Sequence, residues 1–185
     1  VVTGFNAFPY ETNVMVLSPE GPYVLVNNSI VSAGFDDVIE YGESVSLSLN
    51  LENVGNDAAS NLMIEISSDD QYIIITNEST FSSYVESNGV VTVSGLSFDV
   101  AGNVPNNYNF DIICNISTTG SMENQWESTL TYTAYAPVVE IESIIGDLDP
   151  GQTTDMDITI LNNGGTQIIY PVVSVSGDSY ITINN

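Results

Sequence analysis

A short acidic stretch holds the residues best suited to metal chemistry. Asp36, Asp37, Glu40 and Glu43 place four carboxylates within eight positions of residues 34–43. Carboxylate oxygens are the hard ligands that Ca²⁺ takes in proteins, so these four residues are candidate Ca²⁺ ligands and Ca²⁺ is the one cofactor that the sequence suggests. The stretch lacks the regular ligand ladder of an EF-hand. The alternative interpretation is a solvated acidic loop with no ligand.

Few residues of this chain could support nucleophilic or acid–base catalysis. Asp69 and Asp70 could in principle form the carboxylate pair of a glycosidase, but both lie in a predicted turn, which is a sufficient structural reason for Asp. Cys114 lies in an alternating apolar run, which predicts a small buried residue. The chain contains no His, Lys or Arg, so no Ser or Cys nucleophile could be paired with one of these bases. We therefore expect no catalytic residues and no enzyme activity.

The charge balance excludes several classes of partner. The 185 residues include 24 Asp and Glu and no basic residue, so the net charge is −24. Without Lys or Arg the chain cannot neutralise phosphates, which excludes nucleic acid, and anionic membrane surfaces repel it. No run of about 18 apolar residues predicts membrane insertion. Bound cations or high salt would relieve the self-repulsion, and an acidic or halophilic surface protein is the alternative.

The elements that must position these groups are strands of a repeated unit. Residues 42–55 alternate polar and apolar side chains, as a strand with one buried face does. The same pattern returns at residues 151–164, 109 positions later, and residues 70–77 return at 178–185. A period of this size corresponds to one β-sandwich domain. In the second copy the acidic stretch is six residues shorter, and Gln152 replaces its last Glu.

The pattern of short strands and polar turns, with no helical period, predicts the fold class and the domains. The fold class is all-β, with Ig-like antiparallel β-sandwich repeats. Residues 1–20 are predicted to be the tail of a preceding unit plus a linker. Residues 21–136 form one complete sandwich, and residues 137–185 form the first half of a second Ig-like repeat.

Local patterns give further predictions for single strands and side chains. Residues 79–88 are predicted to be a polar connection, and Trp126 a core or rim anchor of the sandwich. Separate short strands are expected over 90–93 and 96–100. In the second repeat the strands are expected over residues 138–145, 153–161, 168–175 and 180–183.

The half-sandwich at residues 137–185 predicts a bare apolar face. Such a face is an aggregation template or a docking surface. Either the polypeptide continues beyond this sequence, or another chain supplies the missing strands. Residues 1–17 resemble the tail of a unit and are a candidate strand donor from a neighbouring copy. Such exchange is head-to-tail and open-ended, so it would build filaments. The expected partners are therefore other protein chains, including copies of this one.

Several segments together resemble a known family of repeats. They are residues 38–47, 53–58, 70–73, 98–105, 126–130 and 136–138, with shorter matches at 4–6, 9–10 and 22–23. They resemble the tandem Ig-like repeats that follow the catalytic domain of gingipain-type cysteine peptidases and that occur in other secreted surface proteins of Bacteroidetes-like bacteria. The catalytic Cys and His of that family belong to a separate domain and match no position here. The resemblance therefore implies an Ig-like fold without the peptidase activity.

These observations lead to one expectation and two alternatives. We expect a non-catalytic Ig-like stalk or adhesion segment of a secreted protein, located outside the cell or on its surface. The first alternative is a self-assembling extracellular filament subunit whose incomplete C-terminal sandwich is completed by a strand from a neighbouring copy. The second is an accessory fragment of a gingipain-like peptidase.

Overall fold

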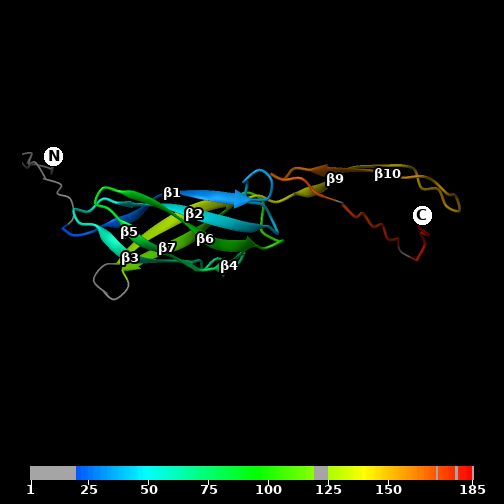
Figure 1. The fold of residues 1–185 in the computed structure, drawn as a ribbon. Helices are drawn as coiled ribbons and strands as arrows, with labels where there is room; N and C mark the ends of the chain where they lie inside the picture. The colour runs from blue at the N-terminus through cyan, green and yellow to red at the C-terminus, as the bar shows by residue number, and fades with distance from the viewer. Residues whose placement is uncertain (1–19, 119–124, 170, 178, 185) are drawn as a thin grey trace, which may run out of the picture.

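Eight strands form an antiparallel β-sandwich, as the sequence predicts. The computed structural model describes residues 20–118, 125–169, 171–177 and 179–184. One four-stranded sheet has the order β1-β2-β6-β4, and the other has the order β5-β3-β7-β8 (Figure 1). The strands are β1 (Val24–Ala33), β2 (Ser44–Asn53), β3 (Ala59–Ser67), β4 (Ile73–Asn77), β5 (Ser79–Val85), β6 (Val90–Val100), β7 (Tyr108–Thr118) and β8 (Gln125–Ala134). The predicted tail at residues 1–17 lies outside the described residues.

The core lies between the two sheets and follows from period-two alternation. In β2 the side chains of Leu47, Leu49 and Leu51 are buried, and the residues between them face outward. Phe98 of β6 and Phe110 of β7 meet across the core in an edge-to-face contact, with ring centroids 5.7 Å apart. Because successive strand residues point to opposite faces, alternation in the sequence becomes one apolar layer per sheet.

The topology is that of an Ig-like sandwich with one variation. The order β1-β2-β6-β4 corresponds to the A-B-E-D sheet, and β3-β7-β8 corresponds to C-F-G. The variation is that β4 and β5 are consecutive in the chain but lie at the edges of opposite sheets. The chain therefore crosses from one sheet to the other at Glu78.

Two local predictions were wrong. The expected polar connection at residues 79–88 contains β5, which pairs with β3. β5 is an edge strand in which only Ser82 and Val85 are buried, so a polar sequence was compatible with a strand there. The two short strands expected at 90–93 and 96–100 are one strand, β6, because Gly95 (φ 96°) carries the chain through a register shift.

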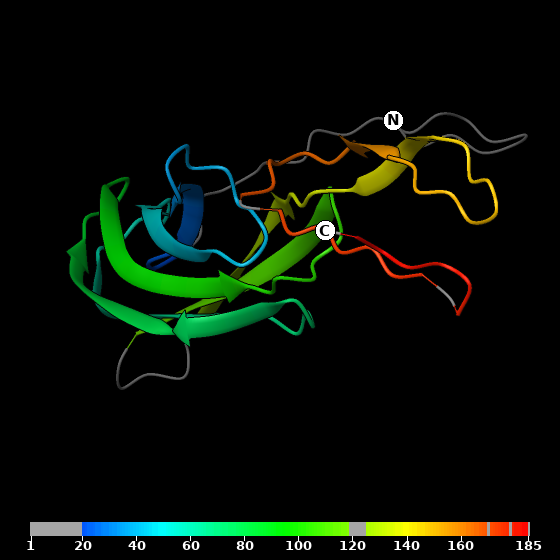
Figure 2. The same cartoon turned by 90° about the vertical axis from the view of Figure 1, so that its right-hand side faces the viewer.

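A second, two-stranded sheet extends beyond one end of the sandwich. It consists of β9 (Val139–Ile145) and β10 (Asp157–Asn162) and projects from the end at which β8 finishes (Figures 1 and 2). The strands expected at residues 168–175 and 180–183 are not formed in the described part of those ranges. Their counterparts in the sandwich, β3 and β4, pair with β7 and β6, and the described residues contain no equivalent partner for the second unit.

The β9–β10 pair has the same strand register as the β1–β2 pair, including a register shift at the equivalent position. Val26 pairs with Leu51 in the first pair, and Ile141 pairs with Ile160 at the equivalent position of the second. The register shifts at the next step in both pairs. The repeat seen in the sequence is therefore a repeat of backbone geometry.

All regular structure in the described residues is strand. None of those residues forms a helix of the length and hydrophobicity that crossing a bilayer requires.

Candidate functional site

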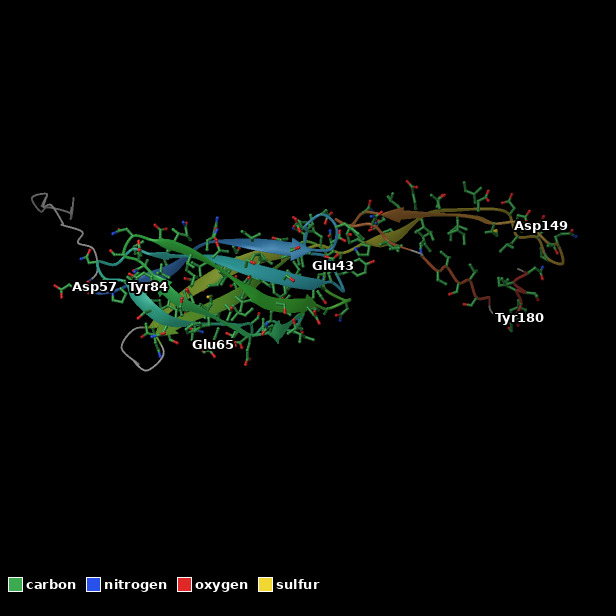
Figure 3. The ribbon with its side chains drawn as sticks, in the orientation of Figure 1. Glu43, Asp57, Glu65, Tyr84, Asp149 and Tyr180 are labelled. Atoms are coloured by element: carbon green, nitrogen blue, oxygen red, sulfur yellow. The ribbon has the colours of Figure 1, made fainter. Side chains whose placement is uncertain are left out.

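The predicted Ca²⁺ loop joins β1 to β2 at the end of the sandwich next to the second sheet, where Figure 3 labels Glu43. Asp36 accepts a hydrogen bond from the Val38 backbone N–H through Oδ1, at 3.1 Å. Asp37 is in the left-handed region (φ 61°), and its N–H donates to the Ala33 carbonyl at 3.0 Å. These are the contacts of turn-forming Asp residues.

Glu43 folds back over the same loop. Its Oε2 accepts the backbone N–H of Glu40 at 3.1 Å, and its carboxylate lies where a Cβ on Gly34 would overlap it. Burial raises the pKa of Glu43 above its ordinary value, and the charges of Glu40 and Asp36 add to the rise. The hydrogen bond from Glu40 acts in the opposite direction. Glu43 therefore closes the loop at some electrostatic cost.

The four carboxylates share a loop but do not surround a common point. Among the described residues, no group of three or more Asp, Glu, Cys or His side chains is arranged to hold a metal ion. Asp36 and Glu43 each accept a backbone N–H of the loop itself. Ca²⁺ binding by Asp36, Asp37, Glu40 and Glu43 stays a prediction.

The loop holds the connection to the second unit. The Tyr41 N–H donates to the Tyr135 carbonyl, and the Tyr135 N–H donates to the Ile39 carbonyl, both at 2.9 Å. Tyr135 directly follows β8, and Glu40 forms a parallel bridge with it. The acidic loop thus fixes the chain where it leaves the sandwich.

Asn106 fastens the start of the second unit to the first. Its Oδ1 accepts the backbone N–H of Ala136 at 3.2 Å and that of Gly165 at 2.9 Å. Gly165 lies so close to the Tyr135 ring that a Cβ there would overlap it. Thr166, the next residue, is buried although most of its neighbours are exposed. One atom of Asn106 therefore holds both the connection at Ala136 and Gly165 of the second unit, 29 residues further on.

Each unit also contains an Asn whose side chain binds three backbone groups, an arrangement that we call the Asn clasp. In the sandwich, Oδ1 of Asn53 accepts the N–H groups of Tyr23 (3.0 Å) and Gly55 (3.1 Å), and its Nδ2 donates to the Asp57 carbonyl (2.8 Å). Asn53 is fully buried.

In the second unit, Oδ1 of Asn162 accepts the N–H groups of Val138 and Gly164, both at 3.0 Å. Its Nδ2 donates to the Thr166 carbonyl at 2.8 Å. The distances match those of Asn53 to within 0.1 Å, so both units contain the same Asn clasp. The sequence signal for this contact is the recurrence of Asn-X-Gly at positions 53 and 162, which the sequence analysis did not use.

The other residues that the sequence singled out, Asp70, Cys114 and Trp126, make contacts within the sandwich itself. Asp70 accepts the Tyr72 N–H (2.8 Å) and the Tyr108 hydroxyl (2.9 Å). The hydrogen bond to Asp70 is the main cause of a raised pKa at Tyr108. Cys114 is free and buried, as predicted, and desolvation raises the pKa of its thiol to about 12. Trp126 packs against the core and meets the Tyr23 ring edge-to-face at 6.4 Å, which confirms its predicted place as an anchor.

Comparisons with known proteins identify no family. No family model matches the chain, and no curated protein matches it. Part of Escherichia coli alpha-2-macroglobulin, from domain MG7 to the C-terminus, is 11% identical with a TM-score of 0.40, over 61% of this chain and 18% of that one. The CARDB domain of the Pyrococcus furiosus PF1109 protein is 11% identical with a TM-score of 0.38, over 68% and 99%.

A third likeness is the PapD-like domain 7 of human CEP192, which is 14% identical with a TM-score of 0.34, over 68% of this chain and 96% of that one. TM-scores below 0.5 carry no argument about function. The all-β sandwich is established by the strand pairing of this chain itself. The resemblance to gingipain-type repeats stays a prediction.

Proposed function

We propose that this chain is a non-catalytic, extracellular stalk or adhesion segment in which Ig-like units are joined end to end. The observation that carries the proposal is that hydrogen bonds hold the junction between the two units. Asn106 accepts the N–H of Ala136, at the end of the first unit, and that of Gly165 in the second, and residues 39 and 41 hold the connection at Tyr135. A flexible linker between independent domains would need neither contact.

The fastened junction supports a mechanical role. Hydrogen bonds from both sides of the connection restrict rotation of the second unit about residues 135–137. The β9–β10 sheet of the second unit extends from one end of the sandwich (Figure 1). Holding successive domains in line is what a surface stalk must do, because its length presents a distant domain away from the cell.

The charge of the chain supports a place outside the cell. A net charge of −24 keeps neighbouring stalks apart by repulsion, and a chain without Lys or Arg offers no cleavage site to trypsin-like proteases. Antibody labelling of intact, unpermeabilised cells tests the location. Signal that appears only after permeabilisation would overturn it.

Small-angle X-ray scattering of the whole chain tests the stalk proposal. Asn106→Ala removes the shared acceptor, so we expect a broader distribution of interatomic distances and a more variable angle between the units. Asn103→Ala, an exposed change in the same loop, is the matched control and should scatter like the parent. If Asn106→Ala leaves the scattering unchanged, the junction is not what holds the units in line.

A second candidate function is a self-assembling filament subunit. It is favoured by the exposed apolar residues of β9 and β10, with the predicted donor strand in residues 1–17 of a neighbouring copy. Negative-stain microscopy separates the two functions. Single elongated particles agree with the stalk, and ordered fibres agree with the filament.

The resemblance to gingipain-type repeats suggests a setting for either role, as an accessory segment of a larger secreted protein. We propose that this chain contributes no catalytic residue to such a protein. A protease assay of the isolated chain should therefore show no activity above buffer.

A further inference from the structure

The chain contains two Asn-Gly pairs, Asn88–Gly89 and Asn163–Gly164. In such a pair the backbone nitrogen of the Gly can attack the side-chain amide carbon of the Asn. A following residue without a Cβ hinders this approach least. Asn is also one of the thermolabile residue types in proteins. Both pairs are therefore candidate sites of spontaneous chemical modification.

The Asn163–Gly164 pair lies inside the Asn clasp of the second unit. The Gly164 N–H donates to Oδ1 of Asn162 at 3.0 Å. The Asn163 side chain is bound as well, because its Nδ2 donates to Oε2 of Glu140 at 3.0 Å. A ring can close only when the amide carbon of Asn163 meets the Gly164 nitrogen, and the structure engages both groups elsewhere.

The first unit has the same clasp without the reactive residue. Val54 stands 109 positions before Asn163. The Val54 N–H donates to the Tyr23 carbonyl, and the Asn163 N–H donates to the Val138 carbonyl, both at 2.8 Å. A Val side chain has no amide to lose, so the reaction at this position of the clasp is confined to the second unit.

We propose that Asn163 is a site of spontaneous deamidation and that Asn162 slows the reaction by binding the Gly164 N–H. The Gly164 nitrogen loses its proton to the solvent and forms a bond to Cγ of Asn163. The bond from Cγ to Nδ2 breaks, and the side-chain nitrogen leaves as ammonia, which gives a succinimide. Water then opens the ring at either carbonyl. The net reaction consumes one water, releases one ammonia and leaves aspartate or isoaspartate at residue 163.

The product fits the clasp less well than Asn163 does. A carboxylate at residue 163 places a like charge beside Glu140 where a hydrogen-bond donor stood. Isoaspartate also adds one methylene to the main chain just before Gly164. The next residue, Gly165, donates its N–H to Oδ1 of Asn106 at 2.9 Å, so the modification disturbs the junction between the units. The modification site itself does not depend on the stalk role.

Mass spectrometry of the whole chain, aged at near-neutral pH, tests the proposal. An Asp-specific protease releases residues 157–177 and 70–98, which contain Asn163 and Asn88. Tandem spectra then place each lost amide. A synthetic peptide of residues 157–167 gives the rate without the fold, and Asn163 in the whole chain should react about tenfold more slowly. Asn162→Ala should speed the reaction at Asn163 by about three- to tenfold and leave Asn88 at its parent rate.

The matched control is Asn162→Asp. It keeps an oxygen that can accept the Gly164 N–H, but it loses the Nδ2 donor to the Thr166 carbonyl. Asn162→Asp should therefore keep the slow rate at Asn163. If it reacts as fast as Asn162→Ala, the Oδ1 acceptor is not what slows the reaction.

Three further results would overturn the proposal. The first is an equal rate at Asn163 in Asn162→Ala and the parent. The second is a parent rate equal to that of the synthetic peptide. The third is equal acceleration at Asn88 and Asn163, because general unfolding would then be the cause. Hydrogen exchange tests the effect on the junction: the modified chain, separated by its added charge, should lose protection at Gly165, and unchanged protection would overturn that effect.

Discussion

Asn53 accepts the backbone N–H of Tyr23, 30 residues earlier in the chain, at 3.0 Å. This contact ties the entry of the chain into the sandwich to the end of β2. Because Asn53 is buried, the N–H groups that it satisfies would otherwise face a site with little water. Asn162 makes the same contacts but is exposed. Comparing the two residues therefore tests how burial changes the contribution of these hydrogen bonds to stability.

Asn53→Ala should destabilise the sandwich by about 2–4 kcal/mol, because it leaves the N–H groups of Tyr23 and Gly55 without their acceptor. Trp126 is the single Trp and lies in the sandwich, so urea unfolding followed by its fluorescence reports this unit alone. Asn162→Ala should leave the Trp126 transition in place. A shift of equal size for both variants would show that the two units unfold together.

Gly55→Ala should destabilise the sandwich by about 1–3 kcal/mol through overpacking. A Cβ at this position would overlap backbone atoms of Gly21, Pro22 and Tyr23, which cannot rotate away as a side chain can. Gly102→Ala is the control, because no atom lies within 4 Å of its added Cβ. Thermal unfolding by circular dichroism measures both, and a normal melting temperature for Gly55→Ala would mean that the clasp tolerates an outward shift of residues 21–23.

Glu43→Gln should stabilise the protein at neutral pH relative to the parent. The folded-state pKa of Glu43 is raised above its ordinary value of 4.5, so the stability linked to this group is complete below that value and is lost as the pH rises through the folded pKa. Gln keeps an oxygen for the Glu40 N–H and cannot ionise.

The measurement for Glu43→Gln is the difference in unfolding free energy between variant and parent, from pH 4 to pH 7 at constant ionic strength. Taking the difference cancels the titration of the other carboxylates. The advantage of the variant should grow with pH across this range. A constant difference, or one that grows towards low pH, would contradict the assigned direction.

Leu49→Ala and Ile158→Ala compare equivalent residues of the two sheets. Leu49 is fully buried between the sheets, so its truncation should cost about 2–5 kcal/mol. Ile158 is partly exposed, so its truncation should cost less than about 1 kcal/mol. Differential scanning calorimetry of the whole chain checks both. A large cost at Ile158 would mean that the β9–β10 face is buried in solution.

Most of the fold was predictable because alternation maps directly onto a two-sided sheet. The apolar residues of β2 alternate strictly with polar ones, and the strand lies within residues 42–55, where the alternation predicted it. Strand β5 was not predicted because an edge strand that buries only two side chains needs no apolar pattern. The strands expected at residues 168–175 and 180–183 have the right pattern but no partner strand among the described residues, and an unpaired strand leaves its backbone groups unsatisfied.

The candidate site was predictable only in part. Sequence reasoning singled out the loop at residues 34–43 for its carboxylates, yet in the structure its backbone at Ile39 and Tyr41 holds Tyr135. Asn106 carried no signal in the sequence, since an Asn in a Gly- and Pro-containing loop is ordinary turn chemistry. Its role depends on Ala136 and Gly165, which are 30 and 59 residues away.

The sequence by itself determined the all-β class, the 109-residue repeat, the buried place of Cys114 and the absence of every basic side chain. These are properties of composition and of period-two spacing, which act within one strand or one turn. Only the tertiary structure decided that Asn106 joins the two units, that Glu43 closes its own loop and that Ile158 and Ile160 lie bare where Leu49 and Leu51 are covered. Those outcomes depend on which segments, distant in the chain, come to lie within hydrogen-bonding or van der Waals distance, and local pattern does not encode that distance.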